Sequence, residues 1–290
     1  MNLRNLRPLL LSAALLGLTA TAALADTTFD RTLNVSSSPD LYVSTGSGNI
    51  RIMPGSGNQI HVVGHVHAGW SAFGDVDGRI TRIVQNPPIT QEGNTVRIGE
   101  TTDHSLFNNV SIDYDISVPA DVALNLHSGS GDVEINHVGR FLSATSGSGN
   151  VRGHGIHGAA DLQAGSGDLE LEEDGPGDVK AKTGSGSIQI HGLNGAFTAR
   201  TGSGDITADG HLQGASTIFA GSGGVKLRLT SDSQFTLEAA TGSGDIRVHM
   251  PGVTAANNET SRHHVTVSVN GGGPPLEIRT GSGDIDISPR

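Results

Sequence analysis

The sequence predicts an all-β protein: a single-chain parallel β-helix (β-solenoid) with 18–19-residue coils and a less regular N-terminal β region. Three observations support this fold class. Gly-Ser-Gly recurs at nearly constant intervals, apolar residues alternate with polar ones on both sides of each copy, and 42 glycines accompany only 3% aromatic residues. A repeated turn between short strands explains all three observations, because such turns need glycine and short stacked strands need few aromatic side chains.

The repeat is defined by the position of its first glycine. Gly-Ser-Gly begins at 46, 55, 129, 147, 165, 184, 202, 221, 242 and 281. The intervals between 129 and 221 are 18, 18, 19, 18 and 19 residues, and the next is 21. The 39-residue interval from 242 to 281 predicts two further coils in which one turn signal is lost.

Each copy lies between two predicted strands. The fourth and sixth residues after the first glycine are apolar, as in Val133 and Ile135 or Ile188 and Ile190, and the residue between them is polar. A second alternating strand precedes each turn. Two such short strands cannot bury their apolar faces alone, so we expect parallel stacking at about 4.8 Å per coil.

The turn residues predict a structural column. We expect the glycines to supply positive φ at a recurring corner, and the central serines to form a ladder of hydrogen bonds rather than to act as nucleophiles. The residue after each turn alternates between charged and neutral types, as in Asp132, Asn150 and Asp168, which keeps a turn-capping oxygen and spaces the charges. The calcium-binding β-roll pattern has a shorter unit and a different aspartate position. The predicted structural turn column is Ser130, Ser148, Ser166, Ser185, Ser203, Ser222, Ser243 and Ser282.

One column resembles a metal-ligand set. His154, Glu172 and His191 occupy equivalent positions in consecutive coils, and imidazole and carboxylate groups suit divalent transition metals. However, each coil supplies one ligand, so the two histidines would lie about 10 Å apart, too far for a shared ion. The sequence therefore predicts no metal and no cofactor. Alternative pairs are His65 with His67 and His154 with His157.

Catalysis has little support in the sequence. There is no Gly-x-Ser-x-Gly motif in a strand-to-helix setting. Polysaccharide-cleaving β-helices need clustered acid and base groups and aromatic residues along a sugar groove, whereas Trp70, Tyr42 and Tyr114 lie outside the regular repeats. We predict that the protein is not an enzyme.

Residues 1–25 are typical of a secretory signal peptide. Arg4 and Arg7 precede the apolar run 9–18, and Ala23-Leu24-Ala25 forms a small-x-small cleavage pattern. The chain lacks cysteine, so stability must come from core burial and hydrogen bonds. Its formal charge of −11 argues against nucleic acid or an anionic membrane as a partner. We expect an exported protein, periplasmic or at the cell surface, without membrane insertion.

Residues 26–125 predict N-terminal β strands and starting coils, and residues 126–290 predict the regular repeat. In the N-terminal part, strands are expected at 60–66, 79–84, 95–98 and 110–118, with surface loops at 69–78 and 100–109. No segment predicts a capped helix. The strand ending near Ile287 is expected at the open end of the solenoid.

The chain resembles a bacterial family labelled "putative adhesin", a domain of unknown function. The resemblance covers nearly all of 40–290 and depends on TGSGDI at 201–206, 241–246 and 280–285, and on SVPADVALNLHSGSGDVEI at 117–135. It implies an exported β-helical domain and supplies no catalytic residues.

These observations favour a non-enzymatic exported envelope protein, an adhesin-like or structural β-solenoid. Its partner would be an envelope protein, a glycan or a cell surface. A periplasmic scaffold or sensor-accessory protein is the first alternative, and a polysaccharide-active β-helix enzyme is the second.

Overall fold

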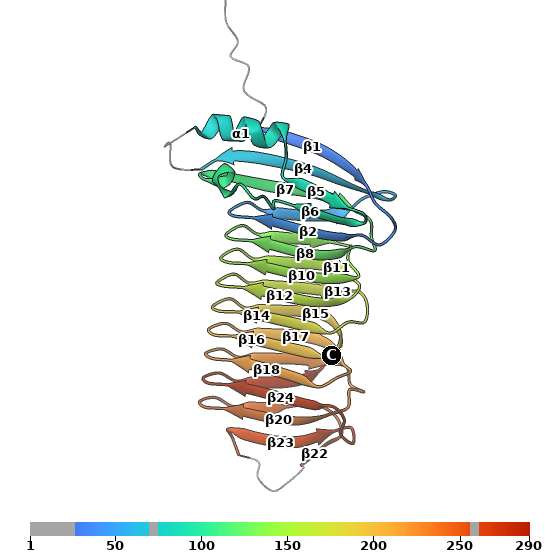
Figure 1. Ribbon diagram of the computed structural model, residues 1–290. Coiled ribbons are helices and arrows are strands. Elements are labelled where there is room, and N and C mark those ends of the chain that lie inside the picture. Colours follow the sequence, from blue (N-terminus) through green and yellow to red (C-terminus); the bar gives the residue numbers. More distant parts are fainter. Residues whose placement is uncertain (1–26, 70–74, 256–260) are drawn as a thin grey trace, which may run out of the picture.

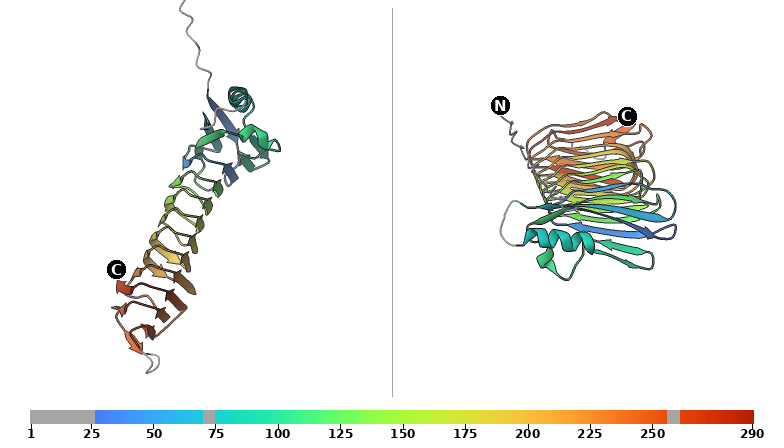
Figure 2. Two further views of the ribbon diagram at one scale, coloured as in Figure 1. Left: turned by 90° about the vertical axis from the view of Figure 1, so that its left-hand side faces the viewer. Right: turned by 90° about the horizontal axis from the view of Figure 1, so that it is seen from above.

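The computed structural model describes residues 27–69, 75–255 and 261–290, and the predicted signal peptide lies outside them. The protein is mostly β, with two long sheets facing each other in a rod (Figures 1 and 2). Most neighbouring strands within each sheet are parallel, as the solenoid interpretation predicts.

In sheet A the strands follow one another in the order β1 (Thr28–Asn34), β4 (Gln59–Ala68), β7 (Val110–Val118), β3 (Ile50–Pro54), β9 (Val133–Asn136), β11 (Val151–Ile156), β13 (Leu169–Glu173), β15 (Ile188–Gly195), β17 (Ile206–Leu212), β19 (Val225–Leu229), β25 (Ile285–Pro289) and β21 (Ile246–Val248). In sheet B the order is β22 (Val253–Ala255), β23 (His264–Val269), β20 (Phe235–Thr241), β24 (Pro275–Thr280), β18 (Ser216–Ala220), β16 (Phe197–Thr201), β14 (Val179–Thr183), β12 (Ala159–Ala164), β10 (Phe141–Ser146), β8 (Ala123–Ser128), β2 (Asp40–Thr45), β6 (Thr95–Ile98) and β5 (Ile89–Glu92).

The core lies between the two sheets and is built from the alternating apolar positions. Leu142 in β10 is in register with Leu124 in β8 and Ala160 in β12, and all three are buried. Ile188 and Ile190 in sheet A are also fully buried. The predicted inward orientation of these positions is confirmed. Each buried Ile or Leu contributes about 1.5–3 kcal/mol by removing apolar surface from water.

The glycines of the turns are required for a different reason from the one that the sequence suggested. Most of them do not have positive φ. A Cβ built on Gly131 would instead lie 2.0 Å from the Gly48 carbonyl oxygen in the adjacent coil, and one on Gly149 would lie 2.2 Å from the Gly131 oxygen. The expectation of positive φ was therefore wrong. Glycine is needed because the backbones of stacked turns approach too closely for a side chain.

The hydroxyl ladder lies two residues earlier in each repeat than the sequence predicts. The predicted serines, such as Ser130 and Ser148, are exposed at the turns. The buried residue before the first glycine makes the hydrogen bonds instead. Ser146 Oγ donates to the Gly131 carbonyl at 2.9 Å and accepts from the Gly149 N–H at 2.9 Å. The other hydroxyls that reach a neighbouring segment in this way are Thr45, Ser128, Thr183, Thr201, Thr241 and Thr280.

Ser146→Ala is expected to lower the free energy of unfolding by about 1–3 kcal/mol, because it leaves a buried carbonyl and a buried N–H without a partner. Ser148→Ala, two residues away on the exposed turn, is the matched control and should change stability by less than about 0.5 kcal/mol. Urea unfolding of both variants checks the assignment. Equal losses of stability in the two variants would indicate that the central serines make stabilising hydrogen bonds as well.

A second ladder follows the turns. The Asp132 carboxylate accepts from the Asn150 N–H at 2.7 Å, and the Asn150 side chain accepts from the Asp168 N–H at 2.9 Å. The predicted turn-capping oxygens therefore cap the backbone of the next coil. Because an amide and a carboxylate can both accept this bond, the charge can be omitted from alternate coils without losing the cap.

One end of the rod is closed by an N-terminal cap, formed by β1 and the described residues between 59 and 118. Here β4 pairs antiparallel with both β1 and β7 (Figure 1). The cap contains helix α1 (Val76–Gln85), which contradicts the predicted strand at 79–84 and the expected absence of helices. The helix forms because Asp75 caps its N-terminus by accepting from the Gly78 N–H, and because Ile80 and Ile83 share one buried face. A short 3₁₀ helix, η1 (His104–Phe107), lies within the second predicted loop.

At the far end of the rod, the strands are stacked in an order that the sequence did not predict. After β21 the chain forms the antiparallel pair β22–β23 and then turns back, so that β24 lies between β18 and β20. In the other sheet, β25 lies between β19 and β21. The interval from 242 to 281 therefore contains β21, a terminal hairpin and the first strand of an inserted coil rather than two successive coils. The expectation that the strand near Ile287 forms the open end was wrong.

Candidate binding cavity

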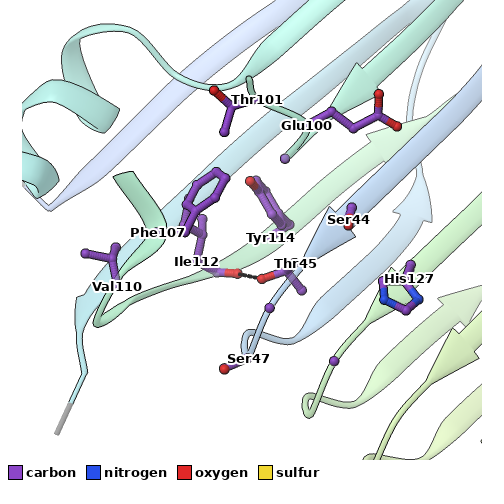
Figure 3. A pocket seen from close by; sticks show the side chains of 13 residues that line it. Ser44, Thr45, Ser47, Glu100, Thr101, Phe107, Val110, Ile112, Tyr114 and His127 are labelled. Atoms are coloured by element: carbon purple, nitrogen blue, oxygen red, sulfur yellow. Dashed lines mark hydrogen bonds between the residues drawn. The ribbon is translucent and has the colours of Figure 1, made fainter. Parts of the chain in front are cut away.

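A cavity of about 540 Å³ lies where the cap meets the first stacked turn (Figure 3). It is bounded by the end of β2, the loop after β6, η1 with the start of β7, and the end of β8. The lining residues are Ser44, Thr45, Gly46, Ser47, Gly99, Glu100, Thr101, Phe107, Val110, Ile112, Tyr114, His127 and Gly129.

Two local contacts position the walls of the cavity. Thr45 Oγ1 donates to the Ile112 carbonyl at 3.0 Å, which fastens the end of β2 to β7 (Figure 3). Gly99 has a φ of +82°, and a Cβ there would lie 1.8 Å from the Ser44 carbonyl oxygen. Only glycine therefore lets the loop after β6 turn this closely against β2.

Tyr114 is the chemically distinctive residue of the cavity. Its side chain is 1% exposed, and its ring packs edge-on against Phe29 with the ring centroids 6.4 Å apart. Its hydroxyl has no hydrogen-bond partner within the described residues. Burial raises the pKa of Tyr114, so the phenol stays neutral and can donate a hydrogen bond.

The surrounding groups define what the cavity can hold. Phe107, Val110 and Ile112 give it an apolar wall, and Thr101 and His127 contribute polar groups. Figure 3 shows the Tyr114 hydroxyl on the side of the cavity where Thr101 and Glu100 lie. The walls fit a small, partly apolar group. An acceptor on that group would reach the phenol only after the wall beside it opened, because the hydroxyl has almost no accessible surface.

Tyr114→Phe is expected to raise the free energy of unfolding by about 1–3 kcal/mol, because it removes a buried hydroxyl for which the described part of the chain offers no partner. Tyr42→Phe is the matched control. Tyr42 lies on the outer face of β2, with the Arg97 guanidinium 4.3 Å from its ring centroid. Thermal and urea unfolding should separate the two variants, and a loss of stability in Tyr114→Phe would show that the hydroxyl is already satisfied in the protein.

The metal-ligand candidates do not converge. His154 Nδ1 lies 3.5 Å from a Glu172 carboxylate oxygen. His191 instead pairs with Asp209, with Nδ1 2.7 Å from the carboxylate. Within the described residues, no group of three or more His, Asp or Glu side chains is arranged to hold a metal ion. The column places these residues side by side in two separate pairs, of which only His154 with Glu172 is exposed or half-exposed on both sides.

Asp209 is the centre of a charged cluster that the alternation pattern did not reveal. Its side chain is only 6% exposed, although its position predicts an outward orientation. Burial favours the protonated form, but the hydrogen bond and charge of His191, and the charge of Arg290, outweigh it and lower the pKa of Asp209. Arg228 also lies 3.4 Å away. These contacts cross several coils of sheet A and brace that sheet.

Glu173 is a second buried acid that the repeat pattern did not predict as a site. It ends β13 on the inward face and is 5% exposed, and neither carboxylate oxygen has a hydrogen-bond partner within the described residues. Burial raises the pKa of Glu173 to about 8, and the negative charge of Asp178 adds to the rise, although the Asn194 backbone offsets part of it. The alternation of β13 could have revealed it, since Leu169 and Leu171 also point inward.

None of the helices in the described part of the chain has the length and apolarity needed to cross a membrane.

Comparisons with known proteins place the chain in a family. No curated protein matches it. It is similar to the crystal structure of a "putative cell adhesion protein" from Clostridium sporogenes ATCC 15579, with 10% identity, a TM-score of 0.30 and coverage of 91% of this chain and 100% of the other. It is also similar to a "putative adhesin" from Bacteroides fragilis NCTC 9343, with 14% identity, a TM-score of 0.36 and coverage of 90% and 96%. These likenesses are too distant to transfer a function. The model of the Toastrack DUF4097 family, however, matches residues 38–288, and the chain therefore belongs to that family.

Proposed function

We propose that this protein is an exported, non-enzymatic envelope protein with an adhesin-like binding role, and that the cavity beside the cap takes a small group of its partner. The observation that carries the proposal is the buried hydroxyl of Tyr114 at the cavity wall, which has no hydrogen-bond partner among the residues that the structure describes. Such a group destabilises the fold, so its presence favours a use in ligand binding.

Two further features support the proposal. Residues 1–25 have the pattern of a secretory signal. The stacked turns, tied by hydroxyl and Asx ladders, make a rod that can hold the cap at a distance from the opposite end (Figure 2). A partner that is an envelope protein, a glycan or a cell surface would suit such a projecting site.

The binding role is tested with fluorescently labelled purified chain on intact cells and on isolated envelope fractions. We expect saturable binding that weakens at least tenfold in Tyr114→Phe and is unchanged in Tyr42→Phe. Because Tyr114→Phe is expected to be more stable than the natural chain, a loss of binding cannot be attributed to unfolding. Equal binding of all three proteins would contradict a role for the cavity.

Export is tested by protease shaving of intact cells, with blotting for the chain and a periplasmic protein as control. Digestion of the chain while the control survives would support surface display. Protection until the outer layer is permeabilised would favour the alternative of a periplasmic scaffold or sensor-accessory protein.

A further inference from the structure

The two faces of the rod differ in how their charges are partnered. On the outer face of sheet A, cations alternate with acids in neighbouring coils and form ion pairs, such as Arg152 with Glu170 at 3.7 Å and Arg51 with Asp115 at 3.0 Å. On the outer face of sheet B, six outward positions of β8 to β18 carry hydroxyl or amide side chains: Asn125, Ser143, Thr145, Gln163, Thr198 and Thr217. His127, Phe141, Asp161 and Phe219 also face outward on these strands.

Three cations stand among these neutral groups, and we call them the basic strip: Lys180 and Lys182 of β14 and Arg200 of β16. Lys182 and Arg200 are directly in register, one coil apart. All three side chains are exposed, and none forms an ion pair with any described residue. Asp161, the nearest acid in register with Lys180, instead accepts from the Gln163 amide at 3.2 Å.

The basic strip lines a shallow groove of about 610 Å³ on the flat face of β12, β14 and β16. At one side of it the Arg200 guanidinium lies 4.5 Å from the centroid of the Phe219 ring, which holds its planar group against the sheet. The strip is therefore a positive surface, with Arg200 held in place, on a chain whose formal charge is −11.

We propose that the basic strip binds an acidic polysaccharide, with sugar carboxylates on Lys180, Lys182 and Arg200 and sugar hydroxyls on the flanking hydroxyl and amide side chains. Adjacent coils are spaced about 4.8 Å apart, so a polymer lying along the rod meets one row of side chains per coil. Carboxylate groups pair with lysine and, with two hydrogen bonds, with arginine. The neutral polar surroundings provide the donors and acceptors that sugar hydroxyls need.

The neutral hydroxyl and amide side chains beside the strip favour a polysaccharide over nucleic acid as the occupant. A uronate polymer and a nucleic acid both carry a negative charge at every unit, so charge alone does not separate them. Each sugar, however, also presents several hydroxyl groups that these neutral side chains can bind. This inference concerns a different surface from the cavity, so it can fail or succeed independently of the proposed role of Tyr114.

The test is binding of the purified chain to polygalacturonate, with dextran as the neutral polymer and single-stranded DNA as a competing polyanion. We expect binding to polygalacturonate that weakens with salt, with little binding to dextran. Lys180→Gln/Lys182→Gln should weaken it at least tenfold. The matched control, Lys226→Gln/Arg31→Gln, makes the same charge change on sheet A and should bind within about twofold of the natural chain.

Thermal unfolding shows that each variant is folded, and Tyr114→Phe shows whether the cavity contributes to this binding. Equal affinities of the strip and control variants would overturn the proposal, because net charge alone would then explain binding. Tighter binding of single-stranded DNA than of polygalacturonate would also overturn it. Failure to bind any of the three polymers would do the same while leaving the cavity proposal untouched.

Discussion

Ile278→Asp is expected to lower the free energy of unfolding by about 4 kcal/mol, the largest effect that we predict for a single substitution. Ile278 is fully buried in β24. It is in register with Ile218 of β18 on one side and Ala239 of β20 on the other. An unpaired carboxylate at this position would be buried against both neighbours, which is among the most destabilising changes a core can undergo.

The loss of stability in Ile278→Asp should be confined to the end of the rod that contains β24. In a repeat protein each coil is stabilised mainly by its neighbours, so β20 and β23 should lose hydrogen-exchange protection while β8 to β14 retain it. Glu277→Ala is the control, since its exposed pairing with Arg279 is worth at most about 1 kcal/mol. Uniform loss of protection along the whole rod would contradict the proposed independence of the two ends.

Because the pKa of Glu173 is raised, we expect the free energy of unfolding to fall as the pH rises, which is the opposite of the usual effect of a carboxyl group. A carboxyl group in the unfolded chain titrates near pH 4.5, whereas the buried group titrates at about pH 8. Between these values the folded protein holds a proton that the unfolded chain has lost. Stability from this group is therefore fully present below about pH 4.5, falls as the pH rises, and levels off above about pH 8. The fall corresponds to about 3–5 kcal/mol at 1.36 kcal/mol per unit.

Glu173→Gln removes this titration, so its stability should be nearly flat over the same pH window and should exceed that of the natural chain at pH 9. Glu172→Gln is the matched control, because the adjacent side chain is exposed and faces outward. It should keep the natural decline. Urea unfolding at pH 5, 7 and 9 checks both variants, and parallel pH curves for the natural chain and Glu173→Gln would show that the buried carboxyl is satisfied.

The sequence predicted the middle of the rod well because there the pattern is local. Alternation alone identified Ile188, Ile190 and Leu142 as core residues. It failed at Glu173 and Asp209 for opposite reasons. Glu173 follows the alternation and was overlooked because it is charged, whereas Asp209 is buried at a position where alternation predicts exposure.

The ends of the rod were harder to predict because their structure depends on contacts between distant segments. In α1, four of the five residues from Ile80 to Val84 are β-branched and resemble a strand, and only the Asp75 cap and the spacing of Ile80 and Ile83 favour the helix. The cavity combines four segments separated by up to 85 residues, from Ser44 to Gly129. The inserted coil has the same sequence pattern whether it stacks last or between two earlier coils.

The contact between stacked glycines also governs how a rod of this kind can change in evolution. Each carbonyl of a turn occupies the space where a side chain of the next turn would stand, as Gly131 does above Gly149. Any coil that carries Gly-Ser-Gly can therefore stack on any other such coil. Duplication of a middle coil would not require further substitutions in its turn. The cap and the β22–β23 hairpin would remain at the two ends. The distance between the cavity beside the cap and the opposite end of the rod would therefore change by about 4.8 Å for each coil gained or lost.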